Sequence, residues 1–541
     1  MSPGHAPVAP NLGRRAGGAN RPAIPVVIMS RPATPTPAAH AGDLRLRGPL
    51  AGRYPAAAAM VMAALIPYLA LSAAIGPITP LIAHGLHMSL QEMSLASGMG
   101  NAAYAVGTVL AVQFAQLLHQ RRMMVLYVGV LVVGSVLQAV AQDPAMFITG
   151  HILQGLCTSL LLIAAVPPLA LGFGLERLRE TAVIMSMCIF GAVALGPLVG
   201  GLQASAHAWR PLFWGVTAIS VTAFVLSLLT FEDTPPFARS APRAPGTIAL
   251  AAAGPVAAFW GASELLTHPF LQLQTCGLLA GGLGLIIVLI VHQYRTPRAL
   301  LTIRTMLTST IPVAGIALAL FAAAASVSAT ALTAGLLAGR YSPVHIGLLY
   351  LPELGGAIAT AVLLGLVISR RAMQLLPLVG MAFLAAGIGV FLIHVPSTQA
   401  TTLVGSGLTG IGLGATVAPA LFCAGFSLPS NNLQRVFAIV ELLRAVAAFM
   451  IAPVFAHLAL TVGGNLRTGT TIALWIGLAL AVAGAALPLA IYLLGGARPE
   501  TPRLEQFLAQ EAPAWHSPPL LAAVRARTAE IGLDQACLEI D

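Results

Sequence analysis

Two ionisable residues stand close together within one of the long apolar segments of this 541-residue chain. Glu441 and Arg444 occupy the run VFAIVELLRAVAAF, which contains no other charged residue. On a helix, a spacing of three places both side chains on one face, where they can neutralise each other. A single charge buried in an apolar environment is costly, so we expect the two residues to form an ion pair.

Two further titratable residues lie inside apolar segments. Glu353 stands in the run LPELGG, and His151 stands in the run FITGHILQG. A carboxylate taken out of water favours its protonated form, and histidine titrates near neutral pH. Glu353, Glu441 and His151 are therefore the candidates for taking up a proton within the apolar part of the chain. For His151 the alternative is a neutral, hydrogen-bonded core residue.

Another apolar segment carries an amide and a phenol three residues apart, Asn101 and Tyr104. With the flexible side chains of Met93 and Met99 nearby, these two residues could line a cavity for amphipathic small molecules. The alternative is that both serve contacts between helices.

The segments that position these residues are membrane helices by composition and length. The chain is 57% hydrophobic and 8% charged, with a mean hydropathy of +0.88. In soluble proteins, by contrast, about a quarter of the residues are charged. Fourteen apolar segments have about 20 residues or more, which is enough to cross a hydrocarbon core of about 30 Å. The chain is therefore predicted to be an all-α polytopic membrane protein.

The arginines indicate how these helices are oriented. Counted from a cytoplasmic N-terminus, the outer loops hold only Arg210, Arg340 and Arg467, whereas the inner loops hold many more. Since basic residues concentrate on the cytoplasmic side of a membrane, both termini are predicted to be cytoplasmic. The same distribution explains the net charge of +10 without nucleic-acid binding, because the arginines do not form one patch interleaved with aromatic residues.

Changes in composition divide the chain into five parts. Residues 1–54 are rich in Pro, Ala, Gly and Arg, and they are predicted to be a disordered cytoplasmic tail. Two predicted six-helix halves, 55–230 and 310–495, flank residues 231–309, which are a linker with a two-helix insertion. Removing both inserted helices would leave the orientation of the rest unchanged. Residues 496–541 regain charge and proline, and they are predicted to be a cytoplasmic C-terminal tail.

The segment GAVALGPLVGGL, which begins at Gly191, places a proline between glycines. A membrane helix tolerates such a proline, and glycines four residues apart form a face on which another backbone can pack closely. In the drug-efflux branch of the major facilitator superfamily, the fifth helix carries a Gly-Pro-x-x-Gly-Gly signature. The chain resembles the fourteen-helix members of this branch over residues 56–495. The residues that match the signature are Gly196, Pro197, Gly200 and Gly201.

Two other motifs of the family are only partly present. The loop between the second and third helices, thought in this family to gate the cytoplasmic side, keeps its basic end at Arg121 and Arg122. It has an apolar residue where the family has an aspartate. In the fourth helix, Gln154 matches the family's Arg-x-x-Gln-Gly element, whereas His151 replaces the arginine associated with proton coupling. The first helix also lacks the acid that proton antiporters of this branch commonly carry.

The resemblance implies a major facilitator fold that works by alternating access of two halves around a central cavity. The expected function is efflux of drugs or lipophilic small molecules, driven by a proton gradient, in a bacterial inner membrane. Arg444 is similar in position to an arginine of this branch, so its pair with Glu441 either fixes helix packing or acts in transport or gating. The expected partners are a small-molecule substrate, protons and the lipid bilayer, and the protein could act as a monomer.

Other functions remain open. A narrow-specificity metabolite transporter without the usual proton coupling is the alternative, and a membrane sensor or a membrane-embedded enzyme is a remote one. No enzymatic activity or cofactor is expected, because the apolar segments lack a His-x-x-x-His or Asp-x-x-Asp pattern and no Walker motif suggests direct use of ATP. No metal is expected either, because the five cysteines are widely separated and lack CxxC spacing.

Overall fold

The computed structural model describes residues 48–231, 244–265 and 267–526. Within these residues, fourteen helices are long and apolar enough to cross a membrane, as the sequence predicts. The all-helical class and the number of spans are thus confirmed. The disorder predicted for residues 1–54 falls almost entirely outside the described residues, as does the end of the predicted C-terminal tail.

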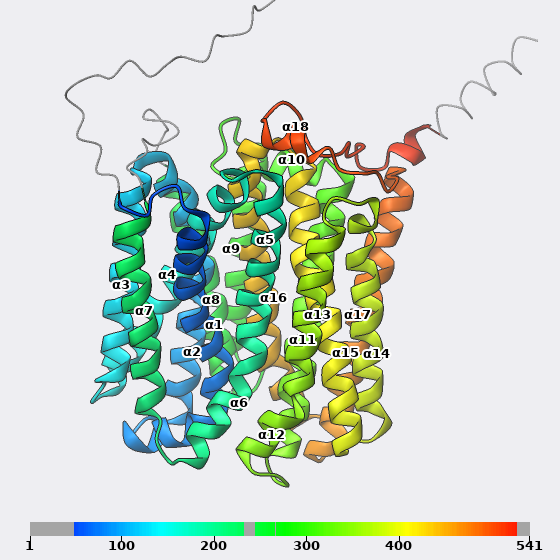
Figure 1. The fold of residues 1–541 in the computed structure, drawn as a ribbon. Helices are drawn as coiled ribbons and strands as arrows, with labels where there is room; N and C mark the ends of the chain where they lie inside the picture. Colours follow the sequence, from blue (N-terminus) through cyan, green and yellow to red (C-terminus); the bar gives the residue numbers. More distant parts are fainter. Residues whose placement is uncertain (1–47, 232–243, 266, 527–541) are drawn as a thin grey trace, which may run out of the picture. The chain divides into compact units, whose positions relative to one another are not determined.

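Helices α1 to α7 form what we call the first half of the molecule (Figure 1). They make six spans, because α5 continues through a π turn, Met187–Gly191, into α6. Polar side chains cap two of the helix starts: Ser89 and Glu92 form a capping box before α2, and Asp143 accepts a hydrogen bond from the Met146 amide in α4. The bounds are α1 Tyr54–Gly85, α2 Leu90–Leu117, α3 Gln120–Ala139, α4 Pro144–Leu171, α5 Gly174–Ser186, α6 Ala192–Ser205 and α7 Arg210–Thr230.

Helices α11 to α17 form what we call the second half (Figure 1). Here α12 and α13 together make one span. A short helix, α10 (Ile303–Leu307), precedes this half, and another, α18 (Leu504–Leu508), follows it. The bounds are α11 Thr310–Leu337, α12 Pro343–Leu349, α13 Leu351–Val367, α14 Leu376–Ile393, α15 Gln399–Phe426, α16 Leu433–Thr461 and α17 Leu466–Gly495.

Two helices, α8 (Pro245–Glu264) and α9 (Leu273–Arg295), lie between the halves in the sequence, and we call them the insertion. Both are long enough to span a membrane, and Pro255 lies within α8 without ending it. The two helices pack against each other, and α8 also packs on α2 and α16. Phe259 of α8 belongs to a buried apolar cluster that includes residues of α2, α9 and α16. The insertion therefore contacts both halves.

The Gly-Pro-x-x-Gly-Gly segment lies in α6, which packs against α1. A Cβ atom at Gly196 would lie 2.5 Å from the Cβ of Ala73, and one at Gly200 would overlap the carbonyl oxygen of Ala74. The close backbone approach that the motif predicts is therefore present, and it requires glycine at these two positions. Pro197 lies inside α6, which continues past it to Ser205.

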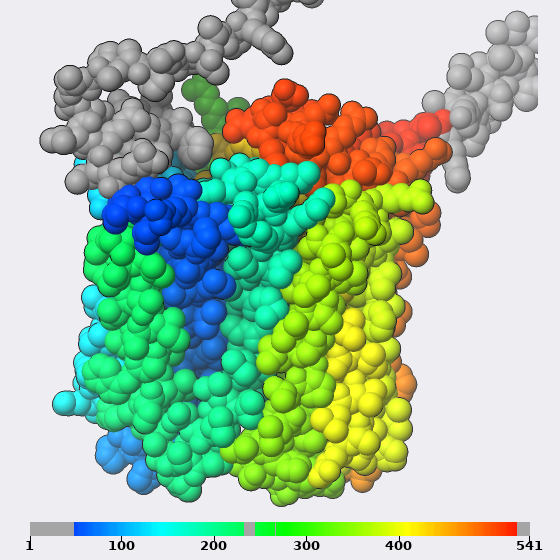
Figure 2. Space-filling view, viewed as in Figure 1, coloured from blue at the N-terminus to red at the C-terminus, as the bar shows by residue number. Residues whose placement is uncertain are grey.

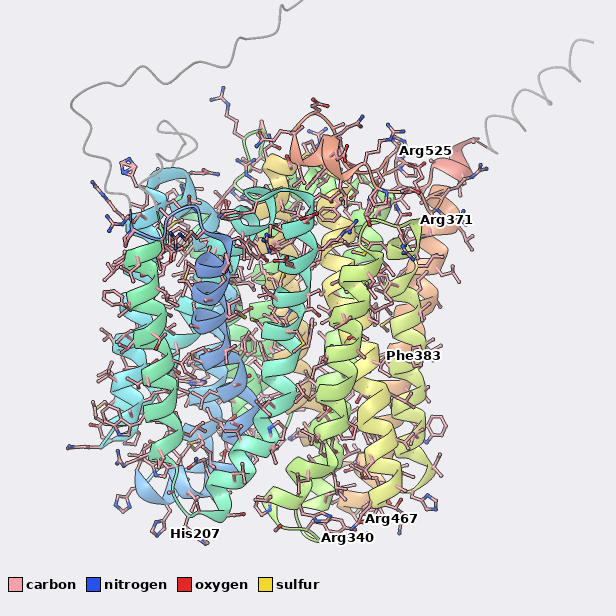
Figure 3. All side chains as sticks on the ribbon, viewed as in Figure 1. His207, Arg340, Arg371, Phe383, Arg467 and Arg525 are labelled. Atoms are coloured by element: carbon pink, nitrogen blue, oxygen red, sulfur yellow. The ribbon has the colours of Figure 1, made fainter. Side chains whose placement is uncertain are left out.

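The start of α1 and the end of α17 lie at the same end of the helices, drawn at the top of Figure 1. We call it the terminal end, and the opposite one the distal end. Figure 3 shows Arg371 and Arg525 at the terminal end, and Arg340 and Arg467 at the distal end. Among the described arginines, only these last two and Arg210 lie in loops or helix starts at the distal end. The asymmetry of charge is thus present, while the side of the membrane that each end faces stays a prediction.

Residues 496–526 lie across the terminal ends of the helices, where Figure 2 shows them in orange and red. Phe507 of α18 and Trp515 pack on Phe426, the last residue of α15. The Ala514 amide also donates a hydrogen bond of 2.8 Å to the Phe426 carbonyl oxygen. Since α18 packs on α5 as well, this part of the C-terminal tail touches both halves.

Candidate functional site

Glu441 and Arg444 of α16 form the ion pair that their spacing predicts. Nη2 of Arg444 lies 2.6 Å from Oε2 of Glu441, and its Nε lies 3.0 Å from the same oxygen. Glu441 is 1% exposed and Arg444 is 7% exposed. Such a pair is stable only while both charges are present, because either charge alone would be buried without compensation.

A tyrosine of the first half completes this pair. The hydroxyl of Tyr104, on α2, donates a hydrogen bond of 3.2 Å to Oε2 of Glu441. The two residues are 337 positions apart in the sequence, so the bond is a polar contact between the halves. The same carboxylate oxygen accepts the two hydrogen bonds of Arg444, and loss of its charge would weaken all three.

Other polar residues of the first half meet beside Tyr104. Tyr68 of α1 donates a hydrogen bond of 2.9 Å to Oδ1 of Asn101, and its ring stacks on that of Tyr104 with centroids 6.0 Å apart. The ring centroid of His151 lies 5.3 Å from that of Tyr68. These contacts make a row of side chains from the first half to the second. We call it the central network, and it consists of Tyr68, Asn101, Tyr104, His151, Glu441 and Arg444.

His151 is a hydrogen-bonded core residue in this structure. Its Nδ1 atom lies 3.0 Å from Nε2 of Gln138 on α3, and the residue is 2% exposed. Gly100 packs so closely on the imidazole ring that a Cβ atom there would overlap it. Three residues further along α4, Gln154 donates a hydrogen bond of 2.9 Å to Oγ of Ser135. The geometry of His151 matches the core-residue alternative.

Glu353 lies apart from these residues, in the first turn of α13. This helix packs mainly against α15 and α5. Glu353 is 8% exposed, and its carboxylate has no hydrogen-bond or ion-pair partner among the described residues. The hydroxyl of the nearby Tyr350 bonds instead with that of Thr333, at 2.5 Å. The two buried glutamates of the second half therefore differ, because only Glu441 is paired with a cation.

Arg121 and Arg122, which the sequence analysis places in the loop before the third helix, lie in the first turn of α3 at the terminal end. Nη2 of Arg121 donates a hydrogen bond of 3.3 Å to the carbonyl oxygen of Leu228, near the end of α7. A cation at this position complements the partial negative charge of the helix C-terminus. Arg122 follows in the first turn of α3. Because α3 and α7 both belong to the first half, the bond of Arg121 ties that half together, and a gating role for the two arginines stays a prediction.

The two halves also touch at both ends. At the distal end, a Cβ atom at Gly201 of α6 would lie 2.5 Å from the carbonyl oxygen of Pro343 in α12. At the terminal end, Nη2 of Arg179 in α5 donates a hydrogen bond of 3.0 Å to Oγ of Ser369, two residues after α13. These contacts would have to open before a path between the halves could reach either end. The glycine motif predicts close packing at Gly201, whereas nothing in the sequence singles out Arg179.

Sequence reasoning also misses Tyr68 and Gln138. Each is a polar residue among mostly apolar neighbours, as in the run LIPYLALS that contains Tyr68. The available signal is that a hydroxyl or amide inside a membrane helix needs a hydrogen-bond partner. That requirement marks both residues as interesting, but it does not say which residues they meet.

Comparison with known proteins gives the same family that the motifs suggest. Residues 60–400 match the family model described as the Major Facilitator Superfamily. The uncharacterized MFS-type transporter YubD of Bacillus subtilis is 26% identical over 364 residues, which are 64% of this chain and 68% of that protein. The multidrug resistance protein B homolog of Mycobacterium tuberculosis is 26% identical over 320 residues, 56% of this chain and 57% of that protein. The tetracenomycin C resistance and export protein of Streptomyces glaucescens is 25% identical over 342 residues, 62% of each chain. The chain thus matches less than two thirds of the length of two of these three relatives.

Proposed function

The chain belongs to the Major Facilitator Superfamily, and we propose that it exports drugs or other lipophilic small molecules in exchange for protons. Membership in the family makes it a multi-pass membrane transporter and not an enzyme. The proposal of export is supported by two relatives, whose names refer to multidrug resistance and to the export of tetracenomycin C. A bacterial inner membrane, with both termini in the cytoplasm, is part of the same proposal.

The observation that carries the proposal is the hydrogen bond from Tyr104 of the first half to the Glu441–Arg444 ion pair of the second half. Alternating access, in which the two halves rock against each other, needs contacts between them that can form and break. Three donated hydrogen bonds converge on one oxygen of Glu441, one from Tyr104 in the first half and two from Arg444 in the second. A proton taken up by Glu441 would remove the charge that holds Tyr104, and release of the proton would restore it.

The same exchange gives a cationic substrate a place in the cycle. With Glu441 protonated, Arg444 is a buried cation without compensation, so it repels a cationic substrate and favours the entry of water. With Glu441 charged, the pair is neutral and a lipophilic cation meets no net positive charge. Binding of the proton and binding of the substrate then exclude each other, as exchange across a membrane requires.

The remaining predicted residues take supporting roles in this proposal. Asn101 and Tyr104 are the proposed cavity-lining residues, because Tyr104 bonds Glu441 and Asn101 is linked to Tyr104 through Tyr68. If Glu441→Gln still exported, His151 and Glu353 would be the next candidates for taking up the proton. Arg121 and Arg122 hold the terminal end of the first half.

Export is tested by the accumulation of fluorescent lipophilic cations in cells with and without the protein, each with and without a protonophore. We expect the protein to lower accumulation, the protonophore to abolish this effect, and Glu441→Gln to abolish it as well. Glu353→Gln is the matched control, and it should export normally. Equal accumulation with and without the protein for every cation would contradict the proposal.

A second candidate function is transport of one metabolite without the usual proton coupling. It is favoured by the first span, Tyr54–Gly85, which contains no acid, and by His151 in the place of an arginine. Metabolite transport that a protonophore leaves unchanged would establish this candidate.

The proposed orientation is tested separately with a C-terminal fusion to a reporter that is active only in the periplasm. The fusion should be inactive, because the described end of the chain lies with the start of α1 and with most of the described arginines. An active reporter would overturn the orientation.

A further inference from the structure

A hollow at the terminal end, away from the central network, is lined by cations. It measures about 1010 Å³ and lies between the insertion, the segment after α9 and the start of α16. Arg298, Arg304 and Arg435 line it together with His292, and its lining contains no aspartate or glutamate. None of the three arginines forms an ion pair with another described residue. Thr302 adds a buried hydroxyl that has no hydrogen-bond partner in the described part of the chain.

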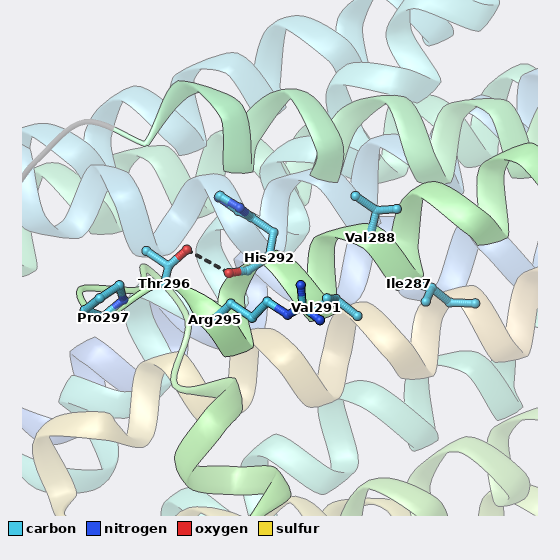
Figure 4. Close-up of a pocket in the computed structure, with 7 residues that line it drawn as sticks. All are labelled: Ile287, Val288, Val291, His292, Arg295, Thr296 and Pro297. Carbon is cyan, nitrogen blue, oxygen red and sulfur yellow. Dashed lines mark hydrogen bonds between the residues drawn. The ribbon is translucent and has the colours of Figure 1, made fainter.

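A second hollow, of about 510 Å³, runs along the outer face of α9. Figure 4 shows its apolar side chains following one another along the helix toward the polar ones at the end of α9. The apolar side chains are 42–60% exposed, and on a spanning helix an exposed apolar side chain faces the acyl chains of lipids. The lining residues are Ile287, Val288, Val291, His292, Arg295, Thr296 and Pro297.

The two hollows adjoin each other. His292, Thr296 and Pro297 line both of them, so the apolar groove along α9 leads directly into the basic hollow. A ligand that fits this shape has an apolar chain at one end and an anionic group at the other. A free anion would leave the groove unused, and an apolar molecule would leave the arginines unpaired.

We propose that the two hollows together bind one anionic phospholipid, with its phosphate among the arginines and one acyl chain along α9. Arginine suits a phosphate because its planar guanidinium donates paired hydrogen bonds to two oxygens. Basic pockets between membrane helices are also favourable sites for anionic head groups. A zwitterionic head group fits less well, because its ammonium group finds no carboxylate in the lining.

The bound lipid would join three parts of the molecule. The lining of the basic hollow includes Gln116 of α2 in the first half, Thr247 of α8 in the insertion and Arg435 of α16 in the second half. The lipid therefore acts as a stabilising link between the insertion and both halves. This inference is independent of the transported substrate and of proton coupling.

The test compares the binding of phosphatidylglycerol and phosphatidylcholine to the purified full-length protein. Native mass spectrometry and thermal unfolding in detergent measure the binding. We expect phosphatidylglycerol to bind more tightly and to raise the melting temperature more than phosphatidylcholine. The double variant Arg298→Gln/Arg304→Gln should bind phosphatidylglycerol roughly 30-fold more weakly, because each arginine near a lipid head group raises the binding affinity about fivefold. The matched control is Arg370→Gln/Arg371→Gln, which removes two arginines of the same end that line neither hollow. It should leave the lipid preference intact.

Two further measurements separate a lipid from a free anion. Val288→Trp fills part of the groove. It should weaken the binding of phosphatidylglycerol and leave any thermal stabilisation by inorganic phosphate unchanged. Inorganic phosphate alone should stabilise the protein much less than phosphatidylglycerol does. Equal stabilisation by inorganic phosphate would overturn the lipid assignment. Equal affinity for the two lipids, or an equal loss of phosphatidylglycerol affinity in the two double variants, would contradict the assignment of this site.

Discussion

Glu441 and Glu353 are both buried glutamates of the second half, yet their surroundings differ. Glu441 lies inside α16 and accepts hydrogen bonds from Arg444 and from Tyr104 of the first half. Glu353 lies in the first turn of α13 and has no such partner among the residues that the structure describes. A buried carboxylate without a cation has no partner to compensate its charge, whereas a carboxylate beside an arginine has one. The comparison teaches that burial alone does not distinguish the two residues; the contacts of Glu441 with a cation and with the opposite half do.

The largest expected effect comes from removing the cation of the pair. Arg444→Ala should lower the free energy of unfolding by about 3–5 kcal/mol, because Glu441 then remains as a buried charge without a partner. Arg340→Ala, at an exposed position of the distal end, should change it by no more than about 0.5 kcal/mol. Folded yield and thermal unfolding in detergent measure both. Equal tolerance of the two changes would remove the distinction between the glutamates.

Replacing each glutamate by glutamine compares the two surroundings directly. Glu441→Gln leaves Arg444 without its charged partner and should cost about 1.5–3 kcal/mol of stability. Glu353→Gln keeps the size of the side chain and breaks no ion pair among the described residues, so it should cost about 0.5 kcal/mol or less. In the efflux assay, Glu441→Gln should abolish export, so that the protonophore no longer changes accumulation in this variant. Glu353→Gln should keep the export and its sensitivity to the protonophore. Loss of export in Glu353→Gln, with normal behaviour of Glu441→Gln, would reverse the assignment.

A smaller effect is expected from the hydroxyl that joins the halves. Tyr104→Phe keeps the stacked ring but removes the hydrogen bond to Glu441, so it should cost about 1 kcal/mol and change the pH dependence of efflux. Tyr68→Phe is the matched control, because it removes a hydrogen bond to Asn101 within the first half. It should cost about as much stability and leave the pH dependence unchanged. Equal changes in pH dependence would mean that the contact between halves has no special role.

The spans and the ion pair could be predicted from the sequence because both depend on local spacing. Apolar runs of spanning length identify the helices, and the three-residue spacing of Glu441 and Arg444 places them on one face. A close approach of α6 to some other helix was predictable for the same reason, since Gly196 and Gly200 are one turn apart, but the identity of that helix, α1, was not.

The contacts between halves could not be predicted in this way. The bond between Tyr104 and Glu441 depends on the depth and rotation of two helices that are far apart in the sequence, and the packing of the whole bundle sets both. In hydropathy alone, Glu353 and Glu441 are equivalent. The charge pattern likewise predicts the end at which Arg121 lies, but not its bond to the carbonyl oxygen of Leu228.

The π turn at Met187–Gly191 sets the rotational phase of the helix that follows it. A π turn accommodates one residue more than an α-helical turn does. If this turn relaxed to α-helix, the residues after it would shift by about 1.5 Å and turn by about 100° relative to those before it. Gly200 would then rotate away from α1, and Gly201 would rotate away from Pro343 of the second half. Relaxation of this one turn would therefore change the surface that the first half presents to its neighbour, and α1 would have to move with it, because a Cβ atom does not fit against α1 at the position of Gly196.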